Sequence, residues 1–188
     1  MSSTNRGYER HVTDYYVTPQ ECIHQFFDAV KDDIDFSKYN NWFDPCSGGD
    51  AVNQMSYPTV IKDIFGVDVQ TMDIREDSLA QTKANYLETV IDKQDIIITN
   101  PPFYLAEEII RKALEDVVSG GAVVMLLRLN FFGSKQRFPL FKHYPPTYAY
   151  VHHRRMSFTD DGKTDSIEYM HAVWIKDKDN KETILKVI

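Results

Sequence analysis

The segment "IIITNPPF", residues 96–103, joins an apolar, β-branched run to a rigid turn that can hold an amino group. The carboxamide oxygen of Asn100 and the carbonyl of Pro101 can together accept both hydrogens of one exocyclic amine, which also directs its lone pair. Pro101 and Pro102 stiffen the turn without adding N–H donors, and Phe103 offers a flat face for a planar base. A turn that only ends the strand is the alternative. The Asn-Pro-Pro-aromatic order favours chemistry on an amine.

Two earlier segments indicate a nucleotide site. In "DPCSGGD", residues 44–50, adjacent glycines let the backbone turn tightly against a ligand before a helix begins. Asp73 follows about 25 residues after Gly48, near the spacing at which nucleotide-binding folds place an acid for the ribose hydroxyls. Taken singly, the glycines also suit a plain strand-to-helix turn, and Asp73 also suits a helix N-cap. Together they favour an adenosine-containing cofactor.

Length and composition bound the class of protein. With 188 residues, of which 43% are hydrophobic and 26% charged, we expect one domain over residues 1–188, with residues 1–14 as a flexible N-terminal arm. No apolar run approaches the roughly 20 residues of a membrane span, and the polar start has no signal-peptide core. Cys22 and Cys46 lack the spacing of a zinc site or a disulfide framework. These features predict a soluble, cytoplasmic protein with no metal.

Strand and helix patterns alternate along the chain, which predicts a mostly parallel, doubly wound sheet with ligands at the carboxyl ends of its strands. Near the end, two strand patterns flank a turn-rich segment and predict an antiparallel hairpin. The expected helices are 19–30, with Thr18 as N-cap, 50–65, a short helix from 77, and 106–118. The expected strands end near residues 44, 73 and 99, and continue with 122–129, 147–153 and 166–177.

In this order the motifs resemble the S-adenosylmethionine-dependent DNA adenine-N6 methyltransferases, especially the small phage-type enzymes. The resemblance covers nearly the whole chain and implies an α/β fold: a Rossmann-like class I methyltransferase sheet. It implies transfer of a methyl group from S-adenosylmethionine to the exocyclic amine of adenine in DNA. It implies a phage or restriction-modification origin.

The resemblance also assigns residues. The catalytic motif is Asn100, Pro101, Pro102 and Phe103. "DYYVTP", "FDPCSGGD", "MDIRED" and "NYL" resemble the cofactor motifs, although "NYL" has Asn where many members have Asp. The residues assigned to the cofactor are Tyr16, Thr18, Pro19, Asp44, Pro45, Cys46, Gly48, Asp73, Ile74, Asn85 and Asn100.

Substrate recognition has to differ from that of larger relatives, because 188 residues leave no room for a separate target-recognition domain. From residue 117 to 159 there is no acidic residue, although the net charge of the chain is -7. We expect cations of this segment to contact DNA phosphates, and a solvated surface is the alternative. These cations are Lys135, Arg137, Lys142, Arg154 and Arg155. Pairing of two copies as a homodimer would be another way to replace the missing domain.

Other functions share parts of this pattern. The "NPPF" order also occurs in RNA methyltransferases, and a close "NPPY" form occurs in protein glutamine methyltransferases. A non-catalytic subunit that binds the cofactor or nucleic acid is a further alternative. A metal site at His152 and His153 is not expected, since neighbours on a strand face opposite sides.

Overall fold

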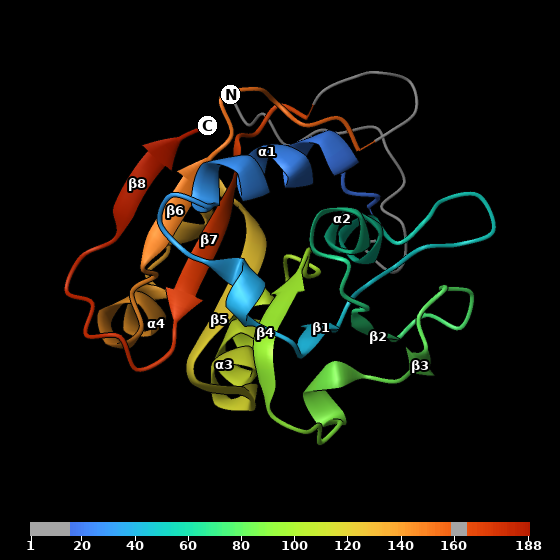
Figure 1. Cartoon of the computed structure of the whole chain (residues 1–188). Helices are drawn as coiled ribbons and strands as arrows, with labels where there is room; N and C mark the ends of the chain where they lie inside the picture. The colour runs from blue at the N-terminus through green and yellow to red at the C-terminus, as the bar shows by residue number, and fades with distance from the viewer. Residues whose placement is uncertain (1–15, 159–164) are drawn as a thin grey trace.

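The computed structural model describes residues 16–158 and 165–188 (Figure 1). The expected N-terminal arm, the first two residues of "DYYVTP", and residues 159–164 lie outside these ranges. The helices are α1 (Gln20–Val30), α2 (Ser56–Phe65), α3 (Ala106–Asp116) and α4 (Phe138–His143), and the 3-10 helices are η1 (Phe36–Lys38), η2 (Tyr86–Glu88) and η3 (Leu129–Phe132). The strands are β1 (Trp42–Asp44), β2 (Gln70–Asp73), β3 (Thr82–Lys83), β4 (Gln94–Thr99), β5 (Val117–Arg128), β6 (Tyr148–Val151), β7 (Tyr169–Ile175) and β8 (Ile184–Val187).

The described strands form one eight-stranded sheet in the order β3-β2-β1-β4-β5-β7-β6-β8. The pairs from β3 through β5 are parallel, β7 is antiparallel to both β5 and β6, and β8 is parallel to β6. The doubly wound sheet with antiparallel C-terminal strands is therefore confirmed. The sequence did not predict the order of the hairpin strands in the sheet. Strand β7 lies between β5 and β6, although it follows both of them in the chain.

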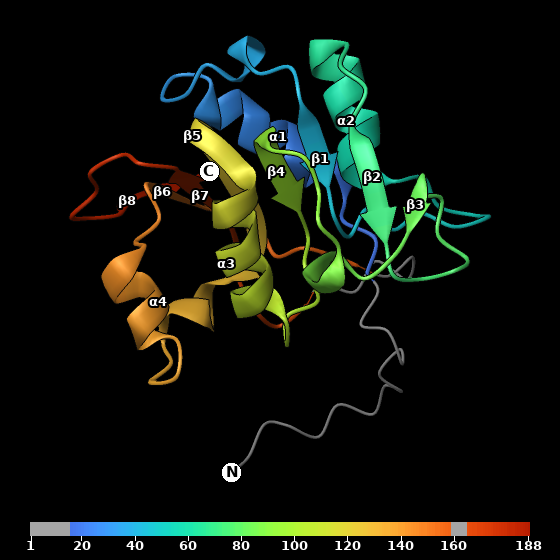
Figure 2. The ribbon, with the colours of Figure 1, turned by 90° about the horizontal axis from the view of Figure 1, so that it is seen from below.

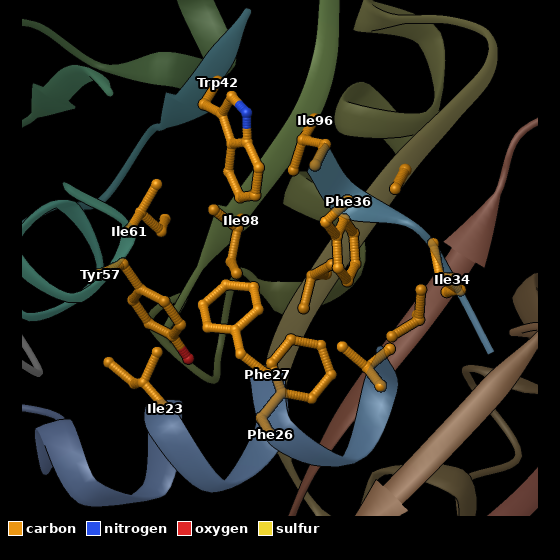
Figure 3. Close-up of a cluster of buried hydrophobic side chains, with 14 of the residues drawn as sticks. Ile23, Phe26, Phe27, Ile34, Phe36, Trp42, Tyr57, Ile61, Ile96 and Ile98 are labelled. Carbon is orange, nitrogen blue, oxygen red and sulfur yellow. The ribbon is translucent and has the colours of Figure 1, made fainter. Parts of the chain in front are cut away.

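Helices cover both faces of the sheet, with α1 and α2 on one side and α3 and α4 on the other (Figure 2). The isoleucines of β4 alternate between the two cores. Ile96 and Ile98 pack with Phe26 and Phe27 of α1, as Figure 3 shows, whereas Ile97 packs in the core that α3 covers. All three isoleucines are fully buried. A strand buried on both faces reads as a continuous apolar run, and β4 thereby carries Asn100 rigidly at its end.

Two expected helices differ from the structure. The helix expected over 50–65 begins only at Ser56, because the Asp50 carboxylate accepts the backbone N–H groups of Val52 and Asn53 and holds a loop there. No helix forms from residue 77. The chain instead reaches β3, and the Gln81 side chain accepts the N–H of Thr71 on β2. Side-chain bonds to the backbone thus outcompete the helical pattern in both places.

The boundaries of two further helices are corrected as well. Helix α1 begins one residue later than expected, with Pro19 at the N-cap and no side-chain capping bond, so Thr18 does not cap it. Helix α3 ends at Asp116, and β5 begins at Val117 rather than at residue 122. No helix in the described ranges has the length and apolar character of a membrane span.

Candidate active site

A cavity of about 300 Å³ lies where β1, β2 and β4 end. This cavity lies at the carboxyl ends of the parallel strands, where a doubly wound sheet is expected to bind its ligands. Among the residues predicted for the site, the following line the cavity: Tyr16, Thr18, Pro45, Cys46, Gly48, Asp73, Ile74, Asn85, Asn100 and Pro102. Pro19, Asp44, Pro101 and Phe103 do not line it.

The glycine loop and Asp73 are built as one unit. The N–H of Gly48 donates to Asp73 Oδ2 at 2.8 Å, and the N–H of Arg75 donates to Oδ1, also at 2.8 Å. Both Gly48 and Gly49 have positive φ, and a Cβ on Gly49 would lie only 2.8 Å from Met55 Cγ. Each carboxylate oxygen of Asp73 keeps a further lone pair for a ligand hydroxyl. This end of the cavity suits a ribose.

Asp44 supports the loop from beneath. Its side chain is almost fully buried, and its Oδ1 accepts the N–H of Cys46 at 3.1 Å. Burial raises the pKa of Asp44 to about 7, with the nearby Asp73 adding to the effect. Asp44 therefore shapes the turn that follows β1, while Pro45 and Cys46 form the surface of the cavity. Burial also holds the pKa of the Cys46 thiol well above its ordinary value, which argues against a nucleophilic role.

Asn100 is oriented by a residue distant in the sequence. Its Nδ2 donates to the hydroxyl oxygen of Thr18 at 3.0 Å, across a sequence separation of 82 residues. Thr18 is almost fully buried, and both side chains line the cavity. With the carboxamide nitrogen engaged by Thr18, the carboxamide oxygen is the group left to accept a hydrogen bond from a ligand.

Asn85 takes part in local structure at the edge of the cavity. Its side chain is the N-cap of η2, where Oδ1 accepts the N–H of Leu87 at 3.1 Å. The carboxamide nitrogen of Asn85 can donate to an acceptor such as a ring nitrogen of a bound adenine, which an Asp at this position cannot do. Asn85 therefore offers hydrogen bonds of a different kind from the acid found in many relatives of this pattern.

Phe103, the aromatic residue of the "NPPF" turn, is packed against other side chains. The Arg128 guanidinium lies over the Phe103 ring at 4.3 Å, and the Tyr169 ring centroid is 5.9 Å from that of Phe103. Tyr104, the next residue, lines the cavity and is 70% exposed. Stacking of a base on Phe103 would require Arg128 to move. Sequence reasoning passed over Tyr104, although its position directly after the motif could have indicated it.

The cations predicted to contact nucleic acid differ in their surroundings. Lys135, Lys142 and Arg154 are exposed. Arg137 donates from Nε to the Phe131 carbonyl at 2.8 Å and lies over the Phe131 ring, so much of its side chain is already engaged. Arg155 forms an exposed ion pair with Glu168 at 3.1 Å. The exposed lysines therefore have the most freedom to reach a phosphate.

The predicted separation of His152 and His153 is observed. His152 is buried and contacts the buried His171, with 2.8 Å between Nε2 and Nδ1, whereas His153 is exposed. His171 Nε2 in turn lies 2.9 Å from the hydroxyl of Tyr57, a residue that lines the cavity. In the described parts of the chain, no three His, Cys, Asp or Glu side chains gather as metal ligands would.

Comparison with solved structures identifies the fold of this chain. A protein described as an S-adenosylmethionine-dependent class I methyltransferase, from Listeria monocytogenes, superposes with a TM-score of 0.64 at 15% identity, over 92% of this chain and 65% of that one. The fold is that of a class I methyltransferase. No protein-family model and no curated protein matches the sequence.

Other class I methyltransferase folds superpose on this chain as well. A protein described as an RNA methyltransferase from Pyrococcus horikoshii gives a TM-score of 0.66 at 12% identity, over 93% of this chain and 94% of that one. The M protein of the type I restriction enzyme EcoKI gives a TM-score of 0.54 at 12% identity, over 79% of this chain and 44% of that one. At these identities the comparisons establish the fold alone.

Proposed function

We propose that this protein transfers a methyl group from S-adenosylmethionine to the exocyclic amine of adenine in DNA. The observation that carries the proposal is the place of Asn100. Its carboxamide lies at the end of β4, in the same cavity as the glycine loop and Asp73. A group that accepts hydrogen bonds from an amine and a group that accepts them from a ribose thus share one cavity.

The residues present fit the cofactor. Asp73 would accept hydrogen bonds from the ribose hydroxyls, and the exposed Ile74 would pack against the adenine, beside Asn85. Tyr16 and Thr18, which also line the cavity, would lie toward the methionine part. When bound, S-adenosylmethionine would supply an electrophilic methyl group on a positively charged sulfur. The protein would contribute the placement of the acceptor amine.

Asn100 would act by positioning and by polarising the amine. Its Oδ1 would accept one amine hydrogen and direct the nitrogen lone pair along the line of methyl transfer. The Pro101 carbonyl, the second acceptor expected from the motif, belongs to a residue that does not line the cavity, so it would accept the other hydrogen only after the turn moves. The N–C bond would form as the C–S bond breaks, and the amine proton would leave to solvent afterwards, when the methylated nitrogen is strongly acidic. Asp44 is not the base, because its carboxyl lies beneath the loop and outside the cavity lining.

The exposed lysines on an otherwise acidic chain favour a nucleic-acid substrate, and they suit the phosphates of DNA and RNA equally. DNA is the first candidate because the order of the motifs resembles that of the DNA adenine methyltransferases. The M protein of a restriction enzyme shares the fold, which agrees with this choice. RNA adenine methylation is the second candidate, favoured by the likeness to the Pyrococcus protein along nearly its full length. In either case the target base would leave its stack at a cost of a few kcal/mol to enter the cavity.

The proposal is tested by incubating the purified protein with methyl-labelled S-adenosylmethionine and separate pools of DNA, RNA and protein. Digestion of the products identifies the methylated unit. We expect N6-methyl-2′-deoxyadenosine from the DNA pool. Label in RNA alone would support the second candidate, and label in protein glutamine would overturn a nucleic-acid substrate. No label in any pool, despite cofactor binding, would overturn the enzymatic proposal for the chain acting alone.

The lysines near α4 should set the salt dependence of DNA binding. The double variant Lys135→Ala/Lys142→Ala should flatten the slope of log K against log[salt] by about 2, since each phosphate contact contributes about 0.9. The slope can be measured by fluorescence anisotropy at several salt concentrations. Arg137 is left intact, because its guanidinium already bonds the Phe131 carbonyl.

The matched control is Lys178→Ala/Lys181→Ala, which removes the same charge from the exposed connection between β7 and β8. This control should lower affinity slightly without changing the slope by the same amount. Equal slopes for the wild type and the Lys135→Ala/Lys142→Ala variant would show that these lysines do not contact phosphates.

A further inference from the structure

The turn after β4 presents alternate residues to the cavity. Asn100, Pro102 and Tyr104 line the cavity, whereas Pro101 and Phe103, which lie between them in the sequence, do not. Of the two neighbouring aromatic residues in "NPPFY", the one that shares the cavity with the Asn100 carboxamide is therefore Tyr104.

The ring of Phe103 is already in contact with other side chains. The Arg128 guanidinium lies over this ring, 4.3 Å from its centroid, and the Tyr169 ring centroid is 5.9 Å away. Phe103 also packs against the buried cluster that Leu126, Met156 and Tyr169 form. A base that stacks on the face beneath Arg128 has to displace a cation that lies there.

Tyr104 is open to solvent and held by the turn. It is 70% exposed, although it lines the cavity. The N–H of Leu105 donates to the Pro102 carbonyl at 2.9 Å, so a hydrogen-bonded turn fixes the backbone on both sides of Tyr104. An exposed aromatic ring on a fixed turn can accept the face of a planar base without displacing a packed side chain.

We propose that Tyr104, rather than Phe103, is the side chain on which the target base stacks. This proposal rests on the proposed function and deepens it, because it assigns the residue of the same site that binds the base. Asn100 would hold the exocyclic amine, and Tyr104 would hold the ring. The stacking role expected of the aromatic residue in "NPPF" would then belong to the next residue in the chain.

The proposal is tested by comparing affinity for an oligodeoxyadenylate with affinity for an abasic oligonucleotide of the same length. Both are measured with S-adenosylhomocysteine present, so that no methyl group is transferred. The two probes carry the same phosphates, so the ratio of the abasic Kd to the oligodeoxyadenylate Kd isolates the contribution of the bases.

Tyr104→Leu should reduce this ratio about 10- to 100-fold, the loss expected when one base–aromatic stack is removed. Tyr104→Phe keeps the ring and should match the wild type. The melting temperature and the Kd for S-adenosylmethionine should change little in both variants, because Tyr104 is exposed and would contact the base rather than the cofactor.

Phe103→Leu is the matched comparison, because it makes the same kind of change one residue earlier. It should reduce the ratio less than Tyr104→Leu does, and an equal or larger reduction would overturn the proposal. A wild-type ratio in Tyr104→Leu, or a wild type that binds both probes equally, would also overturn it. A weaker Kd for S-adenosylmethionine alone would make Tyr104 a cofactor contact instead. If Phe103→Leu does not fold, the result for Tyr104→Leu decides.

Tyr104→Trp supplies a readout that needs no turnover. Trp42 and Trp174, the two native tryptophans, are buried, so an exposed indole at position 104 gives a separate emission. Oligodeoxyadenylate should quench this emission and the abasic probe should not, whereas equal emission with both probes would overturn the stacking role. If no pool accepts methyl label and quenching is still seen, the proposed function fails and the stacking role stands. Label in the DNA pool without quenching gives the reverse result.

Discussion

Asn100→Ala should lower kcat for methyl transfer by about 100- to 1,000-fold, the loss that follows removal of one preorganised polar group from a reacting centre. The physical reason is that the amine would lose the acceptor that aligns its lone pair. Affinity for S-adenosylmethionine should fall far less than kcat, since Gly48 and Asp73, which also line the cavity, remain in place. Single-turnover kinetics with saturating cofactor, together with calorimetric titration, measure the two effects separately.

Asn85→Ala is the matched control. Asn85 is also an asparagine that lines the cavity, but it does not belong to the turn that follows β4. It removes the same side chain and should weaken cofactor affinity more than it lowers kcat. Near-normal turnover by Asn100→Ala would refute the proposed mechanism. A loss confined to cofactor affinity would instead make Asn100 a cofactor ligand only.

Acid should destabilise the fold through the buried His152 and His171. Burial lowers the pKa of His152 to about 4, and burial lowers the pKa of His171 as well. Because both pKa values are depressed in the folded protein, the unfolded chain binds more protons as the pH falls. The contribution of the two neutral histidines to the free energy of unfolding is therefore complete above pH 6.5 and is lost as the pH falls toward 4. For His152 alone, the loss between pH 6.5 and 5 is about 2 kcal/mol.

The measurement compares wild type with His152→Gln, whose side chain can still bond His171 but does not titrate. Asp44 makes the fold more stable as the pH falls through this range, because its pKa is raised to about 7. Both proteins contain Asp44, so its contribution cancels in the difference between them. Urea unfolding at pH 6.5 and 5 should show the wild type losing about 2 kcal/mol more than the variant. Equal losses would mean that His152 stays as easy to protonate as in the unfolded chain.

The sequence predicted the fold where one local pattern decided the structure. The isoleucine run of β4 had to be a central strand, because its residues are apolar at every position and a rigid turn follows. The loop after β1 and the acid that ends β2, which the sequence suggested for one nucleotide site, line the same cavity. The expected helices at 50–65 and from 77 were wrong in part, since single side chains such as Asp50 and Gln81 bond the backbone there. Helical periodicity carries no information about such bonds.

Contacts between distant segments were beyond sequence reasoning. Nothing in "VTP" and "TNPP" indicates that Thr18 would bond Asn100, because the contact depends on how α1 docks beside the end of β4. The Arg128 guanidinium over Phe103 is similar, since β5 and the "NPPF" turn meet only in the folded sheet. The motif indicated which residues to propose for the site, and the tertiary structure showed what they contact.

The insertion of β7 between β5 and β6 has a consequence for synthesis of the chain. Strand β5 pairs with β7 along seven residue pairs, from Ala122 with Ile175 to Arg128 with Tyr169. A ribosome adding about 5–20 residues per second exposes β5 well before β7 emerges. Until then one edge of β5, a strand of mostly apolar residues, has no strand paired with it. Strand β6 cannot yet join the sheet, because β7 is the strand that connects it to β5. The sheet can therefore close only after β7 has emerged.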